Sequence, residues 1–205
     1  MARSGPCYGA SMILRRIAAI CLLALLAGCG RSGTNWHATN ITGAMPALSF
    51  SLSRASDGAP VRAADYRGKV VILYFGYTHC PDICPATLAN LADAIAKLGG
   101  QADDVRVLFV TVDPNRDSGP VLASYVRAFG PQIEGLRGTD DQLTDLARRY
   151  RVVYSVTPDS PGHPYEVMHS AAAFFFDRNG RARLVATKTD DVTGLASDLK
   201  QLLNM

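Results

Sequence analysis

The sequence predicts a three-layer α/β domain built around a mixed β-sheet. Nearly continuous apolar runs at 69–77 and 105–112 are typical of strands covered on both faces, and a segment with helical spacing of apolar residues follows each. Two more apolar segments, at 171–176 and 182–187, flank the sequence DRNG, which is typical of a hairpin turn. Strands alternating with helices, then a hairpin and a closing helix, predict helices on both faces of one sheet.

The first 28 residues are typical of a secretion signal and stand outside the fold. Arg15 and Arg16 precede an apolar segment of about ten residues, which is too short to span a membrane. The LAGC sequence at 26–29 resembles the lipobox of bacterial lipoproteins, in which the chain is cut before the cysteine and that cysteine is acylated. We therefore expect residues 1–28 to be a lipoprotein signal peptide. Cys29 would then anchor the protein to a membrane of the bacterial cell envelope, facing the periplasm.

The segment from residue 29 to residue 46 is small and polar and shows no periodicity, which predicts a flexible linker to a domain of residues 47–205. The formal net charge of +3 comes from the three arginines of the signal, because residues 1–28 contain no acidic residue. The rest of the chain has equal numbers of acidic and basic residues. This balance argues against a nucleic-acid partner.

The domain is expected to begin with a half-buried strand at 48–52, where apolar and polar residues alternate, and a short return strand around Val61. The strand at 69–77 precedes a helix that ends at Gly99 and Gly100. The sequence TDDQ at 139–142 is a possible capping box. The other expected elements are helices at about 121–129, after 139–142 and from Val192 to Leu202, and a short strand at 152–156.

Cys80 and Cys84 are the only cysteines beyond residue 29, and they follow the most apolar expected strand. In open α/β sheets, ligands bind beyond the carboxyl ends of the strands. Two thiols four residues apart on a helical turn lie on one face with Cα atoms about 6 Å apart, which permits a disulfide or a shared metal ion. The amino end of the following helix is expected to lower both thiol pKa values. A redox pair, a metal site and a structural disulfide all remain open, although so short a loop would stabilise the fold little.

Three sequences, YFGYTHCPDICP, VTVDPNRDSG and MHSAAAFFFD, resemble the Sco/SenC family of copper-binding, thioredoxin-like proteins, and the resemblance covers nearly the whole chain beyond residue 46. It implies a thioredoxin-like three-layer sandwich in which Cys80, Cys84 and His169 bind copper. It also implies a role in assembling the dinuclear copper site of cytochrome c oxidase subunit II. Ser118 is a small departure, because the family more often has threonine there.

The residue types agree with that implication. Thiolates prefer Cu(I), and imidazole suits both Cu(I) and Cu(II). His169 precedes the strand at 171–176, and in a thioredoxin-like fold the loop at that place faces the cysteine turn. Thioredoxins have a cis-proline there, whereas no proline is adjacent to His169. A zinc enzyme is a weaker interpretation, because no suitably placed Glu or second His is available as base or ligand.

Two acidic residues are candidates for the surroundings of the site. Asp82, between the cysteines, is expected to cap the helix, with contact to a partner's charge as the alternative. Asp113 begins the VDP turn after the strand at 105–112, and it is expected either to be a plain turn residue or to reach the outer shell of the copper site.

Four other residues with possible ligand atoms are expected to serve elsewhere. An extended backbone would direct His79 away from the neighbouring cysteine, which favours a structural or outer-shell role. Met168 alternates away from the neighbouring histidine and is expected to pack. His163 in a proline-rich loop and His37 in the linker are expected to be exposed.

Two function classes follow from these residues. The first is a metallochaperone that carries copper to an oxidase subunit. The second is a membrane-anchored thiol-disulfide oxidoreductase that uses Cys80 and Cys84. His169 discriminates between them, because only copper retention needs it as a ligand. In an oxidising compartment the pair closes to a disulfide unless a thiol reductant acts on it, so we hypothesise that the redox state controls metal loading.

Overall fold

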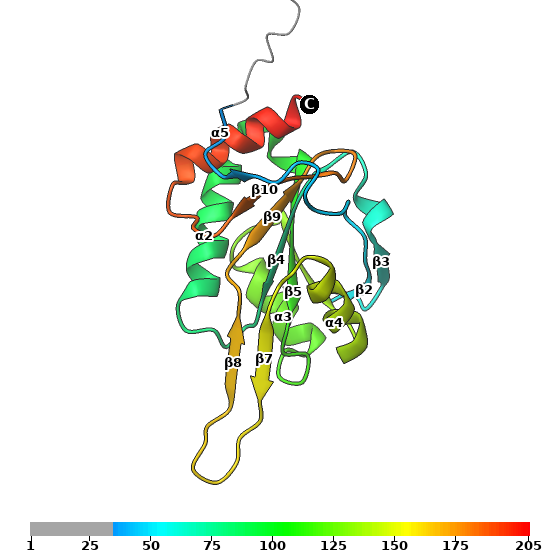
Figure 1. The fold of residues 1–205 in the computed structure, drawn as a ribbon, viewed down its shortest axis with the longest axis vertical. Helices are drawn as coiled ribbons and strands as arrows, with labels where there is room; N and C mark the ends of the chain where they lie inside the picture. Colours follow the sequence, from blue (N-terminus) through cyan, green and yellow to red (C-terminus); the bar gives the residue numbers. More distant parts are fainter. Residues whose placement is uncertain (1–34) are drawn as a thin grey trace, which may run out of the picture. The chain divides into compact units, whose positions relative to one another are not determined.

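A mixed eight-stranded sheet forms the centre of the computed structural model, which describes residues 35–205 (Figure 1). The strand order is β1-β10-β9-β4-β5-β6-β2-β3. Strands β4, β5 and β6 are parallel, and the other pairs are antiparallel. The predicted mixed sheet is therefore confirmed. Its strands are β1 (Thr39–Asn40), β2 (Ser51–Arg54), β3 (Pro60–Arg62), β4 (Val70–Gly76), β5 (Val105–Thr111), β6 (Ile133–Arg137), β9 (Ala173–Phe176) and β10 (Ala182–Ala186).

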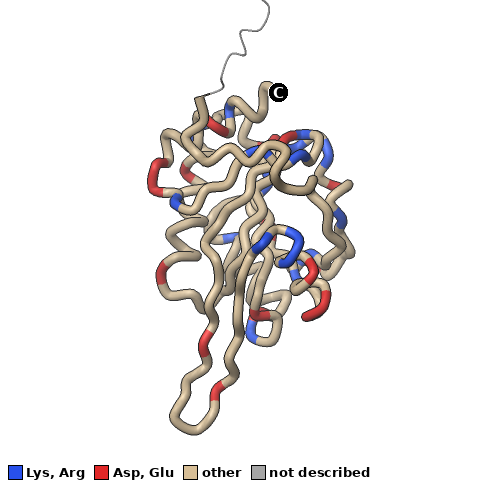
Figure 2. Tube along the Cα trace, in the orientation of Figure 1, with Lys and Arg blue, Asp and Glu red and all other residues tan. Residues whose placement is uncertain are grey.

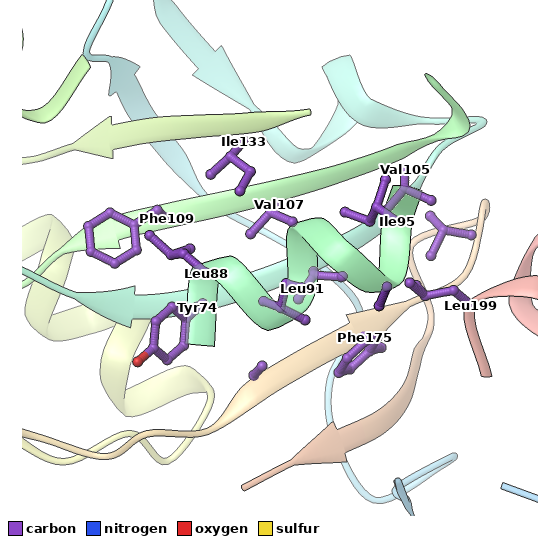
Figure 3. Close-up of a cluster of buried hydrophobic side chains, with 14 of the residues drawn as sticks. Tyr74, Leu88, Leu91, Ile95, Val105, Val107, Phe109, Ile133, Phe175 and Leu199 are labelled. Atoms are coloured by element: carbon purple, nitrogen blue, oxygen red, sulfur yellow. The ribbon is translucent and has the colours of Figure 1, made fainter. Parts of the chain in front are cut away.

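Helices cover both faces of this sheet and complete three layers. Side chains of α2, α3 and α5 pack with one set of alternate strand residues, and side chains of α4 pack with the other set. Figure 3 shows the first of these cores, in which Leu88, Leu91 and Ile95 of α2 lie along the sheet and Ile95 is beside Val105. The helices are α2 (Ile83–Ala96), α3 (Gly119–Arg127), α4 (Asp140–Arg149) and α5 (Val192–Leu203), with short 3₁₀ helices at Ala63–Tyr66 and Gly99–Asp104.

Local sequence signals explain several of these elements. All seven residues of β4 are buried, as expected for a central strand with a core on each face. The predicted capping box of α4 is confirmed, since Thr139 Oγ1 accepts a hydrogen bond from the Gln142 amide and Gln142 Oε1 accepts one from the Thr139 amide. The predicted hairpin turn is also confirmed. Gly180 has a φ of 69° there, and its amide donates to the Asp177 carbonyl oxygen.

The described chain joins the domain earlier than expected. Strand β1 pairs with β10, and the amides of His37 and Ala38 donate to the carboxylate of Asp198, a fully buried residue of α5. We call residues 36–40 the N-terminal strap. The expected flexible linker of 29–46 therefore does not extend through its second half, because backbone pairing, which polar side chains do not reveal, fixes the strap. The expected signal peptide and Cys29 lie outside the described residues.

Strands β7 (Tyr154–Thr157) and β8 (Glu166–His169) form a separate two-stranded hairpin that projects beyond one end of the main sheet (Figure 1). The sequence predicted that His169 directly precedes an uninterrupted strand from residue 171, and it did not predict β8 as a separate strand; His169 ends β8, and β9 begins at Ala173. No Lys or Arg occurs between Arg151 and Arg178, and Figure 2 shows only acidic charges on this hairpin. Within residues 35–205, every helix is too short or too polar to cross a membrane.

Candidate metal centre

The cysteine turn begins where β4 ends. The Cys80 amide donates to the Tyr77 carbonyl oxygen at 3.3 Å, which closes a turn over residues 77–80. Asp82 is the residue before α2, but its side chain makes no capping hydrogen bond, so the expected cap is absent. Instead, the Cys84 amide in the first helical turn donates to Cys80 Sγ at 3.4 Å. The helix start thus directs a backbone donor at the first sulfur.

His169 reaches this turn from the end of β8. Its Nε2 lies 3.3 Å from Cys84 Sγ, and its Nδ1 lies 3.2 Å from the Ser170 carbonyl oxygen. Because a carbonyl oxygen can only accept, Nδ1 carries the ring proton and Nε2 presents a lone pair to the sulfur. The ring stands edge-on to Tyr77 and Tyr74, with centroid distances of 5.7 and 6.2 Å. This is the orientation of a ligand imidazole whose other nitrogen is fixed by a backbone acceptor.

Burial sets the protonation of this pair. Cys84 is fully buried and stands as a free thiol, and burial raises its pKa to about 12. The predicted lowering of both thiol pKa values is therefore wrong for Cys84, because the apolar surroundings outweigh the helix end. Burial also lowers the pKa of His169, so its imidazole is neutral at neutral pH. The Cys84 S–H therefore donates to Nε2.

The three donor atoms fit one soft metal ion. Cys80 Sγ, Cys84 Sγ and a His169 ring nitrogen all lie within 4.8 Å of one another. Donors bonded to one metal at about 2.0–2.3 Å stand about 3.3–4 Å apart, so a small contraction would bring all three into place. Two thiolates and an imidazole suit Cu(I) better than a hard cation. No carboxylate belongs to this cluster among the described residues.

Asp113 does not contact these donors. Its buried carboxylate accepts hydrogen bonds from Tyr165 Oη at 2.8 Å and from Arg116 Nε. The Arg116 guanidinium also lies 3.9 Å from the centroid of the Tyr165 ring. Asp113 therefore fastens the loop of the β7–β8 hairpin to the domain, and its effect on His169 is indirect.

The remaining candidates lie outside the donor cluster. Met168 is 61% exposed, so the prediction that it packs is wrong; the hairpin strand turns it outward to solvent while His169 faces inward. His79 and His163 are exposed. His37 is also exposed, and its Nδ1 lies 3.4 Å from Oδ2 of Asp191, the residue before α5.

Sequence reasoning missed two residues that shape the cysteine turn. Asp117 is fully buried and accepts hydrogen bonds from the Thr78 amide, from Thr78 Oγ1 and from Thr111 Oγ1. Gly76 leaves room for the thiol, because a Cβ there would lie 2.7 Å from Cys84 Sγ and 2.6 Å from Phe109 Cε2. The available signals were a second acidic residue in VDPNRD and a glycine at the end of a strand.

The chain is similar to known proteins of one family. The family model described as SCO1/SenC matches residues 42–204. The protein SCO2 homolog, mitochondrial, of Mus musculus is 42% identical over 125 residues, which cover 60% of this chain and 49% of the relative. The SCO2-like protein RP587 of Rickettsia prowazekii is 36% identical over 116 residues, covering 56% of this chain and 57% of the relative. The chain spans about half the length of the curated relatives it matches.

Solved structures of Sco proteins are similar to this chain in fold. ScoI of Bradyrhizobium japonicum with copper bound has a TM-score of 0.69 and 32% identity, covering 77% of this chain and 99% of that one. Apo Sco1 of Thermus thermophilus has a TM-score of 0.74 and 34% identity, covering 84% of this chain and 99% of that one. The three-layer domain is thus the thioredoxin-like fold of these proteins. With the family model matched along nearly the whole domain, the chain belongs to the SCO1/SenC family.

Proposed function

We propose that this protein is a copper carrier in which Cys80, Cys84 and His169 hold one copper ion. The observation that supports this most directly is the convergence of two sulfurs and one imidazole nitrogen within 4.8 Å. Related Sco structures from Bradyrhizobium japonicum and yeast were solved with copper bound. The donor set favours Cu(I) as the carried state.

The proposed recipient is the dinuclear copper site of cytochrome c oxidase subunit II, which the family resemblance implies. Delivery at a membrane agrees with Cys29 as a lipid anchor of a bacterial envelope protein. The site lies where the hairpin leaves the domain, at an end where β8, β4 and the start of α2 meet (Figure 1). A recipient can approach there without displacing the main sheet.

The residues of the chain do three things in this function. Cys84 gives up its proton when its sulfur becomes a ligand, and burial returns that proton to the sulfur when the copper leaves. His169 offers Nε2 without needing to lose a proton, because its ring proton sits on Nδ1 against Ser170. The Cys84 amide stabilises negative charge on Cys80 Sγ. Copper uptake is therefore coupled to proton release.

A thiol-disulfide oxidoreductase is the less supported alternative. Thiol exchange does not need the imidazole nitrogen that lies 3.3 Å from Cys84 Sγ, whereas copper retention does. Burial raises the pKa of Cys84 to about 12, so exchange would have to begin at Cys80. We propose instead that the pair must be kept reduced by a thiol reductant to accept copper. Closure to a disulfide would remove both sulfur ligands at once.

The test is a Cu(I) titration of the reduced, anaerobic chain against a competing chelator. We expect one equivalent to bind tightly and the double variant Cys80→Ser/Cys84→Ser to lose binding. His169→Ala should weaken binding by at least about 10–100-fold, the range found even for groups one shell beyond the metal. The matched control is His163→Ala, which removes an exposed imidazole from the same hairpin and should bind as the unsubstituted chain does.

Two results would contradict the proposal. The first is Cu(I) binding by the unsubstituted chain that is no tighter than binding by the double-cysteine variant, which would favour the oxidoreductase. The second concerns redox control. If the disulfide form binds copper as tightly as the reduced form, the redox state does not control loading.

A further inference from the structure

His79 stands beside the donor cluster without belonging to it. It occupies a corner of the turn closed by Tyr77 and Cys80, and its side chain is 53% exposed. It is not one of the three residues whose ligand atoms converge. The imidazole lines a shallow hollow with Pro120, Val121 and Tyr125. His79 thus carries a solvent-facing imidazole one residue before Cys80, the more exposed of the two cysteines.

A hydrogen-bond chain determines the tautomer of the neutral His79 imidazole. Thr78 Oγ1 donates its single proton to Asp117 Oδ1 at 2.6 Å. Asp117 Oδ2 is occupied by the Thr78 amide and by Thr111 Oγ1. At 3.0 Å from His79 Nδ1, the Thr78 hydroxyl can therefore only accept, so Nδ1 carries the ring proton. The lone pair is left on Nε2, the nitrogen that makes no hydrogen bond to Thr78.

This arrangement repeats that of His169. Both rings donate Nδ1–H to a fixed oxygen, the Ser170 carbonyl in one case and the Thr78 hydroxyl backed by Asp117 in the other. An anchored second nitrogen is characteristic of histidines that bind metals, because it fixes the ring and raises the basicity of the free nitrogen. The two imidazoles differ in access: His169 is half-buried and His79 is exposed.

We propose that His79 is an entry ligand, which takes Cu(I) through Nε2 from a donor complex and passes it to Cys80. This inference rests on the proposed copper-carrier function. Cu(I) keeps its oxidation state throughout. The bond from the donor to Cu(I) breaks as the Nε2 bond forms, and the Nε2 bond breaks as Cys80 Sγ binds. The Cys80 and Cys84 thiol protons pass to solvent as the two sulfurs bind, and His169 Nε2 then completes the site.

The test separates the rate of loading from the affinity at equilibrium. Reduced chain is mixed in a stopped-flow instrument with the Cu(I) complex of bicinchoninate, at one pH, and loss of the coloured complex is followed. We expect His79→Gln to load about tenfold more slowly, within the one to three decades over which association rates of related complexes vary, with an unchanged Kd. The matched control is His37→Gln. This variant changes an exposed imidazole of the N-terminal strap, whose Nδ1 lies near Asp191, and it should load at the unsubstituted rate.

A second pair of variants tests the hydrogen-bond chain. Thr78→Val removes the hydroxyl between His79 and Asp117 and should also slow loading, while Thr78→Ser keeps the hydroxyl and should restore it. Should Thr78→Val fail to fold, His79→Gln still decides the question.

Loading of His79→Gln at the unsubstituted rate would overturn the entry role and leave the copper carrier intact. A loss of affinity as large as that of His169→Ala would also overturn it, since His79 would then be a resident ligand. Absence of Cu(I) binding by the unsubstituted chain would overturn both proposals.

Discussion

The candidate metal centre takes its donors from two regions of unequal burial. Cys84 lies at the start of α2 within the buried core, together with Leu88 and Leu91. His169 lies at the base of the β7–β8 hairpin, whose residues are all exposed or half-buried. Regions with few buried apolar contacts open locally at low free energy. We therefore expect the cysteine side to be held rigidly and the hairpin that carries His169 to open more readily.

The largest expected contrast comes from the same kind of truncation in the two regions. Leu91→Ala removes a fully buried side chain of α2 and should lower the free energy of unfolding by about 2–5 kcal/mol. Val156→Ala in the half-buried hairpin should cost about 1 kcal/mol or less, because little apolar area is lost from the core. Chemical denaturation measures both. Equal losses would show that the hairpin is as firmly packed as the helix.

An intermediate loss of stability is expected at Gly76, where the surroundings of the cysteines have no room for an added methyl group. Gly76→Ala would place a methyl group 2.6 Å from the Phe109 ring and 2.7 Å from Cys84 Sγ, which should cost about 1–3 kcal/mol and displace the thiol. Copper affinity should fall as well. Gly100→Ala is the control, because a Cβ there meets nothing within 4 Å. Unchanged affinity in Gly76→Ala would mean that the cysteine side adapts after all.

The smallest effect is expected on the histidine side. Tyr165→Phe removes one hydrogen bond to Asp113, which keeps its contact with Arg116, so the loss should be about 1 kcal/mol and confined to the hairpin. Amide hydrogen exchange should become faster in residues 154–169 and stay the same in β4 and α2. Faster exchange throughout the core would show that the two regions unfold together.

Much of the central sheet could be predicted because its strands carry strong local signals. The runs that became β4 and β5 are apolar on both faces, and the capping box of α4 and the turn after β9 have residues suited to their geometry. The place of the cysteine pair followed from the end of β4. Its pairing with His169, 85 residues away in sequence, came from the family resemblance.

The missed elements owe their structure to tertiary contacts. Strand β6 carries Glu134, Gly135 and Arg137 in five residues, a composition with weak strand signal, and its pairing with β5 stabilises it. Strand β8 has four residues and needs β7 beside it. Burial at Cys84 depends on Gly76 and Tyr74, whose approach to the sulfur cannot be read from spacing. The sequence alone therefore could not predict that the pKa of Cys84 is raised.

The N-terminal strap has a practical consequence for handling the molecule. It lies against α5 and β10, and the C-terminus lies beside α5 as well, at the end of the domain away from the hairpin (Figure 1). A fluorophore on Met205, or a sensor surface coupled there, would stand clear of the thiols. Chains captured in this way would present the cysteine turn to the solution, so binding of a candidate partner could be measured by flowing it over the surface.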